Sequence, residues 1–138
     1  MSTINHIQDE IIEEFSLLDD WMDRYQMIID MGNDLPAMPE EEKVPEHIIE
    51  GCQSRVWING EVDSNGLLQL RADSDAVIVK GIIAMLLKIL SGQKPSDIAT
   101  ADLYFIDKVG LRDHLSPTRS NGLVSMVRHI KLLASTQG

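Results

Sequence analysis

Apolar residues recur at steps of three and four along residues 4–29, with acidic and polar residues between them. This spacing predicts an apolar stripe along helical structure. Asp19 and Asp20 are suited to cap a second helix before Trp21, so we expect a break there. Gly32 is expected to end that second helix. The stripe consists of Ile4, Ile7, Ile11, Phe15, Leu18, Met22, Tyr25 and Ile29.

The helical pattern stops over residues 33–50, where Pro36, Pro39 and Pro45 surround the acidic run 40–42. Loops of this length in compact domains are usually functional or mobile. This one leads directly to Cys52, the only cysteine of the chain.

Apolar and polar residues then alternate over residues 56–59 and 67–72, which predicts two β-strands. The stretch Asp-Ser-Asn-Gly at 63–66 lies between them. Asn-Gly favours a hairpin turn because both residues tolerate a positive φ. Asn59-Gly60 is a competing turn, but it would leave the first strand very short.

The rest of the chain is expected to be helical. Ser74 and Asp75 suit the start of a helix over 76–90 that is apolar on nearly all sides, as in a central buried helix. Ser91-Gly92 is expected to stop it, and short helical pieces are expected around 95–97 and 103–111. Serine and proline at 116–117 open a final helix. Its expected inward face consists of Leu123, Val127, Ile130, Leu133 and Ala134.

Length, charge and cysteine content narrow the class of protein. The 138 residues fit a single domain, and no boundary interrupts them. A net charge of −10 disfavours nucleic-acid backbones and anionic membrane surfaces as partners. The longest apolar run, 76–90, contains two lysines and is too short to span a bilayer. One cysteine and no secretory signal indicate the cytoplasm.

Cys52 has three candidate roles: a buried apolar side chain, a metal ligand or a nucleophile. A structural zinc site needs about four ligands at close spacing, which one cysteine and four scattered histidines do not provide. One thiolate cannot hold an iron–sulfur cluster either. Most free cysteines are buried and inert. Cys52, however, follows Gly51 at the entrance of a strand, where a loop can present it.

Several charged residues are candidates to act with Cys52. Arg55, His47 and Arg119 are candidate cations for stabilising a thiolate. Asp113-His114 could supply a hydrolase base, but no cysteine-protease signature surrounds Cys52. Arg119 falls in the first turn of the last helix, where the helix dipole disfavours a cation. It either pairs with a carboxylate of the fold or is held for something outside it.

Three segments stand out together: GCQSRVW at 51–57, SDAVIVKG at 74–81 and HLSPTRSNGLVSMVRHI at 114–130. In this order they resemble the three signatures of the SufE family of sulfur-acceptor proteins, which includes CsdE. The segment 19–36 also resembles the first part of that family, so the resemblance runs from about residue 15 to residue 133.

The resemblance implies an α+β fold, with a short antiparallel β-sheet packed by helices, like that of the U-type iron–sulfur scaffolds. It also implies that the protein binds a pyridoxal-phosphate cysteine desulfurase of the SufS or CsdA type. Cys52 would take over the persulfide sulfur of that enzyme and pass it to an iron–sulfur scaffold complex. No cofactor or metal is then expected on this chain, because the partner's pyridoxal phosphate breaks the carbon–sulfur bond.

On this interpretation Cys52 is the catalytic residue of a sulfur-transfer partner that does not act alone. Gly51 and Ser54 are expected to shape its loop. Partner-binding or loop-supporting roles are expected for Arg55, Asp75, Lys80 and Arg119. We expect a monomer or a weak homodimer. Two alternatives stay open: a binding-only regulator whose cysteine is structural, and a scaffold that assembles a cluster itself.

Overall fold

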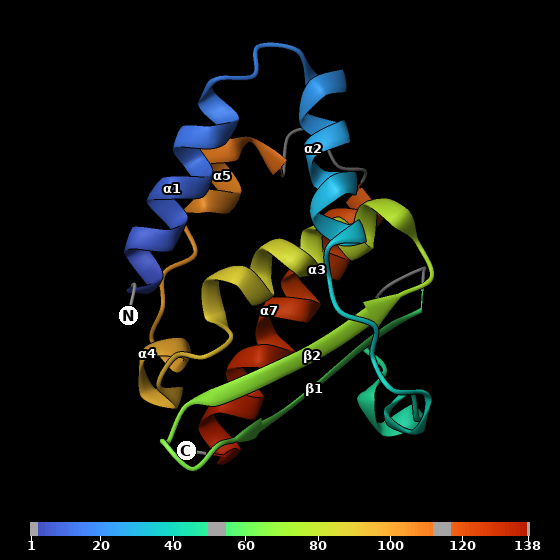
Figure 1. Ribbon diagram of the computed structural model, residues 1–138, viewed down its shortest axis with the longest axis vertical. Coiled ribbons are helices and arrows are strands. Elements are labelled where there is room, and N and C mark those ends of the chain that lie inside the picture. The colour runs from blue at the N-terminus through green and yellow to red at the C-terminus, as the bar shows by residue number, and fades with distance from the viewer. Residues whose placement is uncertain (1–2, 50–54, 112–116, 138) are drawn as a thin grey trace.

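A two-stranded antiparallel hairpin carries helices on one of its faces (Figure 1). The computed structural model describes residues 3–49, 55–111 and 117–137, with the backbone alone for 117–121 and 137. The elements, in chain order, are α1 (Ile4–Ser16), α2 (Trp21–Asn33), the 3-10 turns η1 (Glu40–Glu42) and η2 (Pro45–His47), β1 (Val56–Val62), β2 (Leu68–Ser74), α3 (Val77–Leu90), α4 (Pro95–Ala99), α5 (Phe105–Val109) and α7 (Pro117–Gln137).

The predicted break between the first two helices is confirmed. The Asp20 carboxylate accepts a hydrogen bond from the backbone N–H of Met22 at 2.9 Å and caps α2. The predicted stripe holds along α1 but is wrong at Met22, whose surface is 72% exposed. The break at residues 17–20 resets the helical phase, so α2 instead buries Ile28 and Gly32.

Gly32 does not end α2, contrary to the sequence prediction, because the helix continues to Asn33. Gly32 is buried where α2 crosses α3, and a Cβ at this position would lie 2.8 Å from the backbone nitrogen of Gly81. A Cβ on Gly81 would in turn run into the carbonyl oxygen of Ile28. The two glycines are therefore needed for close approach of the helices.

The hairpin forms at the predicted turn. β1 and β2 pair from Val62–Leu68 at the turn to Val56–Ser74 at the open end. Gly66 has a φ of +79° in the connecting turn. The competing Asn59-Gly60 turn does not form, because both residues lie within β1.

Helix α3 begins at Val77, later than the predicted capping by Ser74. Ser74 is the last residue of β2, and its hydroxyl donates to the carbonyl of Arg55 at 2.9 Å. The same hydroxyl oxygen accepts the backbone N–H of Ala76 at 3.2 Å, so Ser74 links the residue before β1 to the residue before α3 instead of capping the helix itself. The expectation of a central buried helix is confirmed, since most side chains of α3 are buried.

The later helices match their predictions in place. α4 and α5 are the short helical pieces, and α7 begins at Pro117; Ser116 lies outside the described residues. The core lies between the inner face of the hairpin, α3 and α7. The predicted α+β class is confirmed. Among the described residues, no helix has the length and apolar character needed to cross a membrane. The inward face of α7 consists of Leu123, Met126, Ile130 and Ala134, with Val127 and Leu133 half-buried.

Candidate functional site

The described residues on either side of the segment 50–54 meet at the open end of the hairpin. The backbone N–H of Ile49 donates to the carbonyl of Val56 at 2.9 Å, and Ile48 forms an isolated β-bridge with Trp57. Ile49 is buried in the core. The chain therefore enters and leaves this segment at one fixed place. Cys52, Gly51 and Ser54 lie outside the described residues.

Arg55 and Asp75 are brought together at this end of the hairpin. The backbone N–H of Arg55 donates to Asp75 Oδ1 at 3.0 Å, and its carbonyl accepts from the Asp75 N–H at 3.2 Å. Ser74 adds the hydroxyl bond to the same carbonyl. Both Arg55 and Asp75 are exposed. These contacts fix the backbone at residue 55, directly after the segment that contains Cys52.

Lys80 is half-buried and pairs with a carboxylate that sequence analysis did not single out. Its Nζ lies 3.5 Å from Asp73 Oδ1, and the Nζ of Lys43 lies 3.0 Å from Asp73 Oδ2. Asp73 is only 8% exposed. Burial would raise the pKa of Asp73, but hydrogen bonds from Lys43 and the Ser74 N–H, with the charges of both lysines, hold that pKa below its usual value.

Lys43 links the acidic run to the hairpin. The hydrogen bond to Asp73, and a second to Glu40 at 3.1 Å, raise the pKa of Lys43. The ammonium also lies 5.5 Å from the centre of the Trp57 ring, within the range of a cation–π contact. Alternation along β2 places Asp73 beside Arg71 on the outer face of the hairpin. Nothing in the sequence pattern shows that residues 40–47 cover that face.

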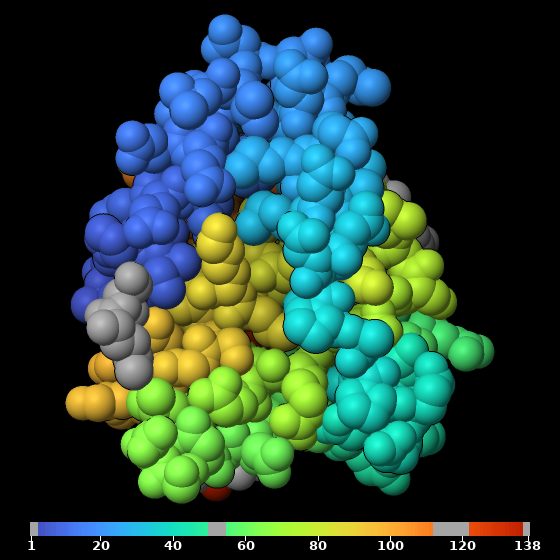
Figure 2. All heavy atoms as spheres, in the orientation of Figure 1, coloured from blue at the N-terminus to red at the C-terminus, as the bar shows by residue number. Residues whose placement is uncertain are grey.

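The acidic run itself is bound to the hairpin, although sequence analysis assigned it no role. Glu42 Oε1 accepts from Arg71 Nε at 2.6 Å and from Asn59 Nδ2 at 3.0 Å. Burial would raise the pKa of Glu42, but these hydrogen bonds and the charge of Arg71 lower it. Figure 2 shows the segment that contains η1 and η2 lying against the strands.

The other candidate cations are placed only in part. His47 is half-buried, and its Nδ1 contacts the carbonyl of Glu42. Arg119 lies in the first turn of α7, with its side chain outside the description, and Asp113 and His114 lie outside the described residues. Within the described ranges, no three histidine, cysteine or acidic side chains form a group that could hold a metal ion.

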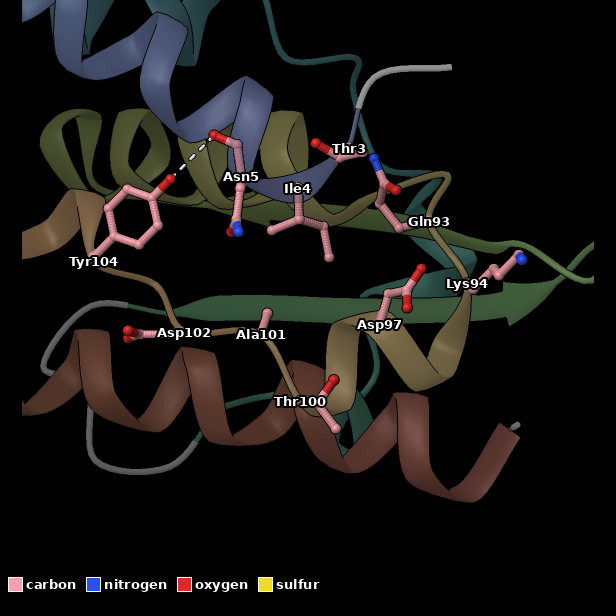
Figure 3. Close-up of a pocket in the computed structure, with 10 residues that line it drawn as sticks. All are labelled: Thr3, Ile4, Asn5, Gln93, Lys94, Asp97, Thr100, Ala101, Asp102 and Tyr104. Carbon is pink, nitrogen blue, oxygen red and sulfur yellow. Dashed lines mark hydrogen bonds between the residues drawn. The ribbon is translucent and has the colours of Figure 1, made fainter.

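A separate cavity of about 580 Å³ lies beside the start of α1 and α4, away from the open end of the hairpin (Figures 1 and 3). At its edge the Tyr104 hydroxyl lies 3.1 Å from the carbonyl oxygen of Asn5 and donates to the Asp9 carboxylate at 2.7 Å. The hydrogen bond to Asp9, with burial and the charges of Asp9 and Asp102, raises the pKa of Tyr104 to about 12. No residue predicted for the functional site lines this cavity.

Comparison with known proteins identifies the family to which this chain is similar. The family model described as SufE, an Fe-S metabolism associated domain, matches residues 9–134. An uncharacterized SufE-like protein of Rhizobium meliloti is 44% identical over 128 residues, which cover 89% of this chain and 91% of the relative. A SufE-like protein of Rhizobium etli is also 44% identical over 128 residues, covering 89% and 86%.

The fold has a solved counterpart as well. The solution structure of a hypothetical protein from Thermus thermophilus superimposes with a TM-score of 0.79 over 95% of both chains, at 20% identity. At that identity the likeness shows the fold alone. The family match places this α+β chain among proteins of iron–sulfur metabolism. The chain belongs to the SufE family.

Proposed function

We propose that this protein accepts sulfur from a pyridoxal-phosphate cysteine desulfurase on Cys52 and passes it on for iron–sulfur cluster assembly. The observation that carries the proposal is the lone cysteine of a SufE-family chain, in a segment whose flanks are hydrogen-bonded together at Ile49 and Val56. A desulfurase of the SufS or CsdA type, in the cytoplasm, is the proposed donor.

The transfer needs only a thiolate and a persulfide. The Cys52 thiolate attacks the outer sulfur of the donor's persulfide, a new S–S bond forms, and the donor's own S–S bond breaks. The donor cysteine leaves as a thiolate, and Cys52 carries the persulfide. No electrons are gained or lost overall. The same exchange, with an acceptor thiolate as the attacking group, moves the sulfur on to the scaffold complex.

A single cysteine suits this task. A second thiol nearby could attack the inner sulfur of the persulfide, form an internal disulfide and release sulfide. Cys52 has no such neighbour in its own chain. The borrowed sulfur is therefore protected from loss within the protein.

The surrounding residues are proposed to present Cys52. Arg55 and Asp75 support the chain directly after it through their backbone and side-chain contacts. Gly51 and Ser54 shape the segment itself. Lys80, at the Asp73 carboxylate, supports the outer face of the hairpin, and Arg119, in the first turn of α7, is proposed to contact the partner.

Intact-mass measurement tests the proposal directly. The protein is incubated with a SufS-type desulfurase and free cysteine, and we expect a gain of about 32 Da, one sulfur atom, that is lost on treatment with reductant. Cys52→Ser should abolish the gain and the stimulation of sulfide release. The change is nearly isosteric, so circular dichroism should show an intact fold.

The outcomes separate the alternatives. A serine variant that stimulates the desulfurase fully would contradict the proposal and favour a binding-only regulator. A visible absorbance after anaerobic reconstitution with iron and sulfide would favour a scaffold. Sulfur found on the wild-type protein but absent from position 52 after peptide mapping would also contradict it.

A further inference from the structure

The Asp73 carboxylate joins three parts of the chain. It lies on the outer face of β2, accepts a hydrogen bond from Lys43, before the cysteine segment, and forms an ion pair with Lys80 on α3. Its Oδ1 also accepts the backbone N–H of Ser74 at 2.8 Å. Its side chain is 11% exposed, against 20% for Lys43 and 30% for Lys80. We call these three side chains the ionic clamp.

The clamp holds a stretch of chain that has little apolar anchoring of its own. Over residues 36–49 only Met38 and Ile49 are buried. Between these two residues, Lys43 pairs with Asp73, and Glu42 pairs with Arg71 and accepts a hydrogen bond from Asn59. Ile49 is anchored by its burial and by its backbone hydrogen bond to Val56. The charged contacts therefore position the part of the stretch that leads up to this anchor, at the flank of the cysteine segment.

Stability alone does not account for the clamp. Taking a carboxylate and two ammonium groups partly out of water costs desolvation energy, and well-packed apolar residues often stabilise such a place as well or better. The cluster does, however, tie three separate parts of the chain to one point, since both ammonium groups lie at the same carboxylate. The clamp therefore sets position more than it adds stability.

We propose that Asp73 is a positioning residue for sulfur uptake: it fixes the stretch 40–49 against the hairpin and α3, and so sets where Cys52 meets the donor. This inference rests on the proposed function. Asp73 takes no part in the bond exchange itself. It acts through Lys43, whose stretch leads into the cysteine segment, and through Lys80, which ties the carboxylate to the first turn of α3.

Asp73→Asn tests the proposal because it keeps the size of the side chain and an acceptor for the Ser74 N–H. Sulfur uptake from a SufS-type desulfurase, charged with free cysteine, is followed by intact mass at a series of concentrations. We expect the maximal rate to fall about tenfold, since small misplacements of a reacting group cost rate strongly. The half-saturating concentration should stay unchanged, because the clamp lies within this chain.

Companion variants separate positioning from general damage. Lys43→Met keeps the stem beside Trp57 and should lower the maximal rate as Asp73→Asn does, while the double variant should lose no more than either alone. Asp73→Glu should restore most of the rate.

Glu61→Gln is the matched control, because Glu61 is an exposed carboxylate on the same face, 3.3 Å from Arg71, and outside the clamp. Iodoacetamide should alkylate Cys52 at least as fast in Asp73→Asn as in the wild type.

The possible results distinguish a failure of the clamp from a failure of the proposed function. Wild-type maximal rates in both Asp73→Asn and Lys43→Met would overturn the clamp and leave the proposed function standing. If Asp73→Asn does not fold, Lys43→Met alone decides in the same way. A wild-type protein that gains no sulfur would overturn the proposed function and the clamp together.

Discussion

At the scale of single residues, Gly81 lets α2 and α3 pack closely because it has no side chain. A Cβ at this position would meet the backbone of Ile28, which belongs to α2 and cannot turn aside as a side chain could. Helix propensity favours Gly81→Ala by about 1 kcal/mol. Overpacking against backbone costs about 1–3 kcal/mol and occasionally more, so the clash should win.

We therefore expect Gly81→Ala to lower the free energy of unfolding by roughly 2 kcal/mol, measured by urea denaturation. Lys88→Ala, at an exposed position of the same helix, serves as the control and should change it little. A Gly81→Ala protein as stable as the wild type would show that α2 and α3 can move apart without loss.

Single residues also mark what the sequence could not reveal. Residue preferences at helix ends predicted that Gly32 would end α2 and that Ser74 would cap α3, and both predictions were wrong. Each is decided by a contact between residues far apart in the chain: Gly32 with Gly81, and Ser74 with Arg55. Local propensity carries no information about such contacts. The pairing of Lys43 with Asp73 was not predicted either, because these two residues are also far apart in the chain.

At the scale of elements, the hairpin depends on its turn. Gly66 has a φ of +79°, and a Cβ there would meet nothing within 4 Å. The cost of a side chain is therefore conformational only. We expect Gly66→Ala to lower the free energy of unfolding by about 1 kcal/mol and Gly66→Asn by less, because asparagine tolerates this region.

Ser64→Ala, at an exposed position of the same turn, is the matched control in urea denaturation. Equal stability of Gly66→Ala and the wild type would mean that the turn relaxes to a negative φ. The hairpin was predicted well because its determinants are local: two alternating stretches and an Asn-Gly turn. Its covering by residues 40–47 is not local and was not predicted.

The site follows the same division. Arg55 and Asp75, singled out from the sequence, are joined by hydrogen bonds at the end of the hairpin where the flanks of the cysteine segment meet. Lys80 was also singled out, but its partner Asp73 was not. The family resemblance pointed to these residues, whereas only the fold shows which of the described ones contact each other.

At the scale of the whole molecule, we expect the free energy of unfolding to decrease in two stages as the pH is lowered. Burial is the main cause that lowers the pKa of His129 from 6.5, so the unfolded chain binds a proton there more readily than the folded one. Stability should therefore fall as the pH drops below 6.5. His129→Gln should flatten this first stage.

The second stage belongs to carboxylates that hold the outer face of the hairpin. The folded pKa values of Glu42 and Asp73 lie below their ordinary values of 4.5 and 3.8. Their stabilisation is complete above those ordinary values and is lost as the pH falls through the folded ones. Urea denaturation at a series of pH values should show this loss, reduced in Glu42→Gln and in Asp73→Asn but not in the exposed control Glu61→Gln. A loss of equal size in all four proteins would mean that ion pairs elsewhere govern acid unfolding, and that residues 40–47 stay attached to the hairpin without these charges.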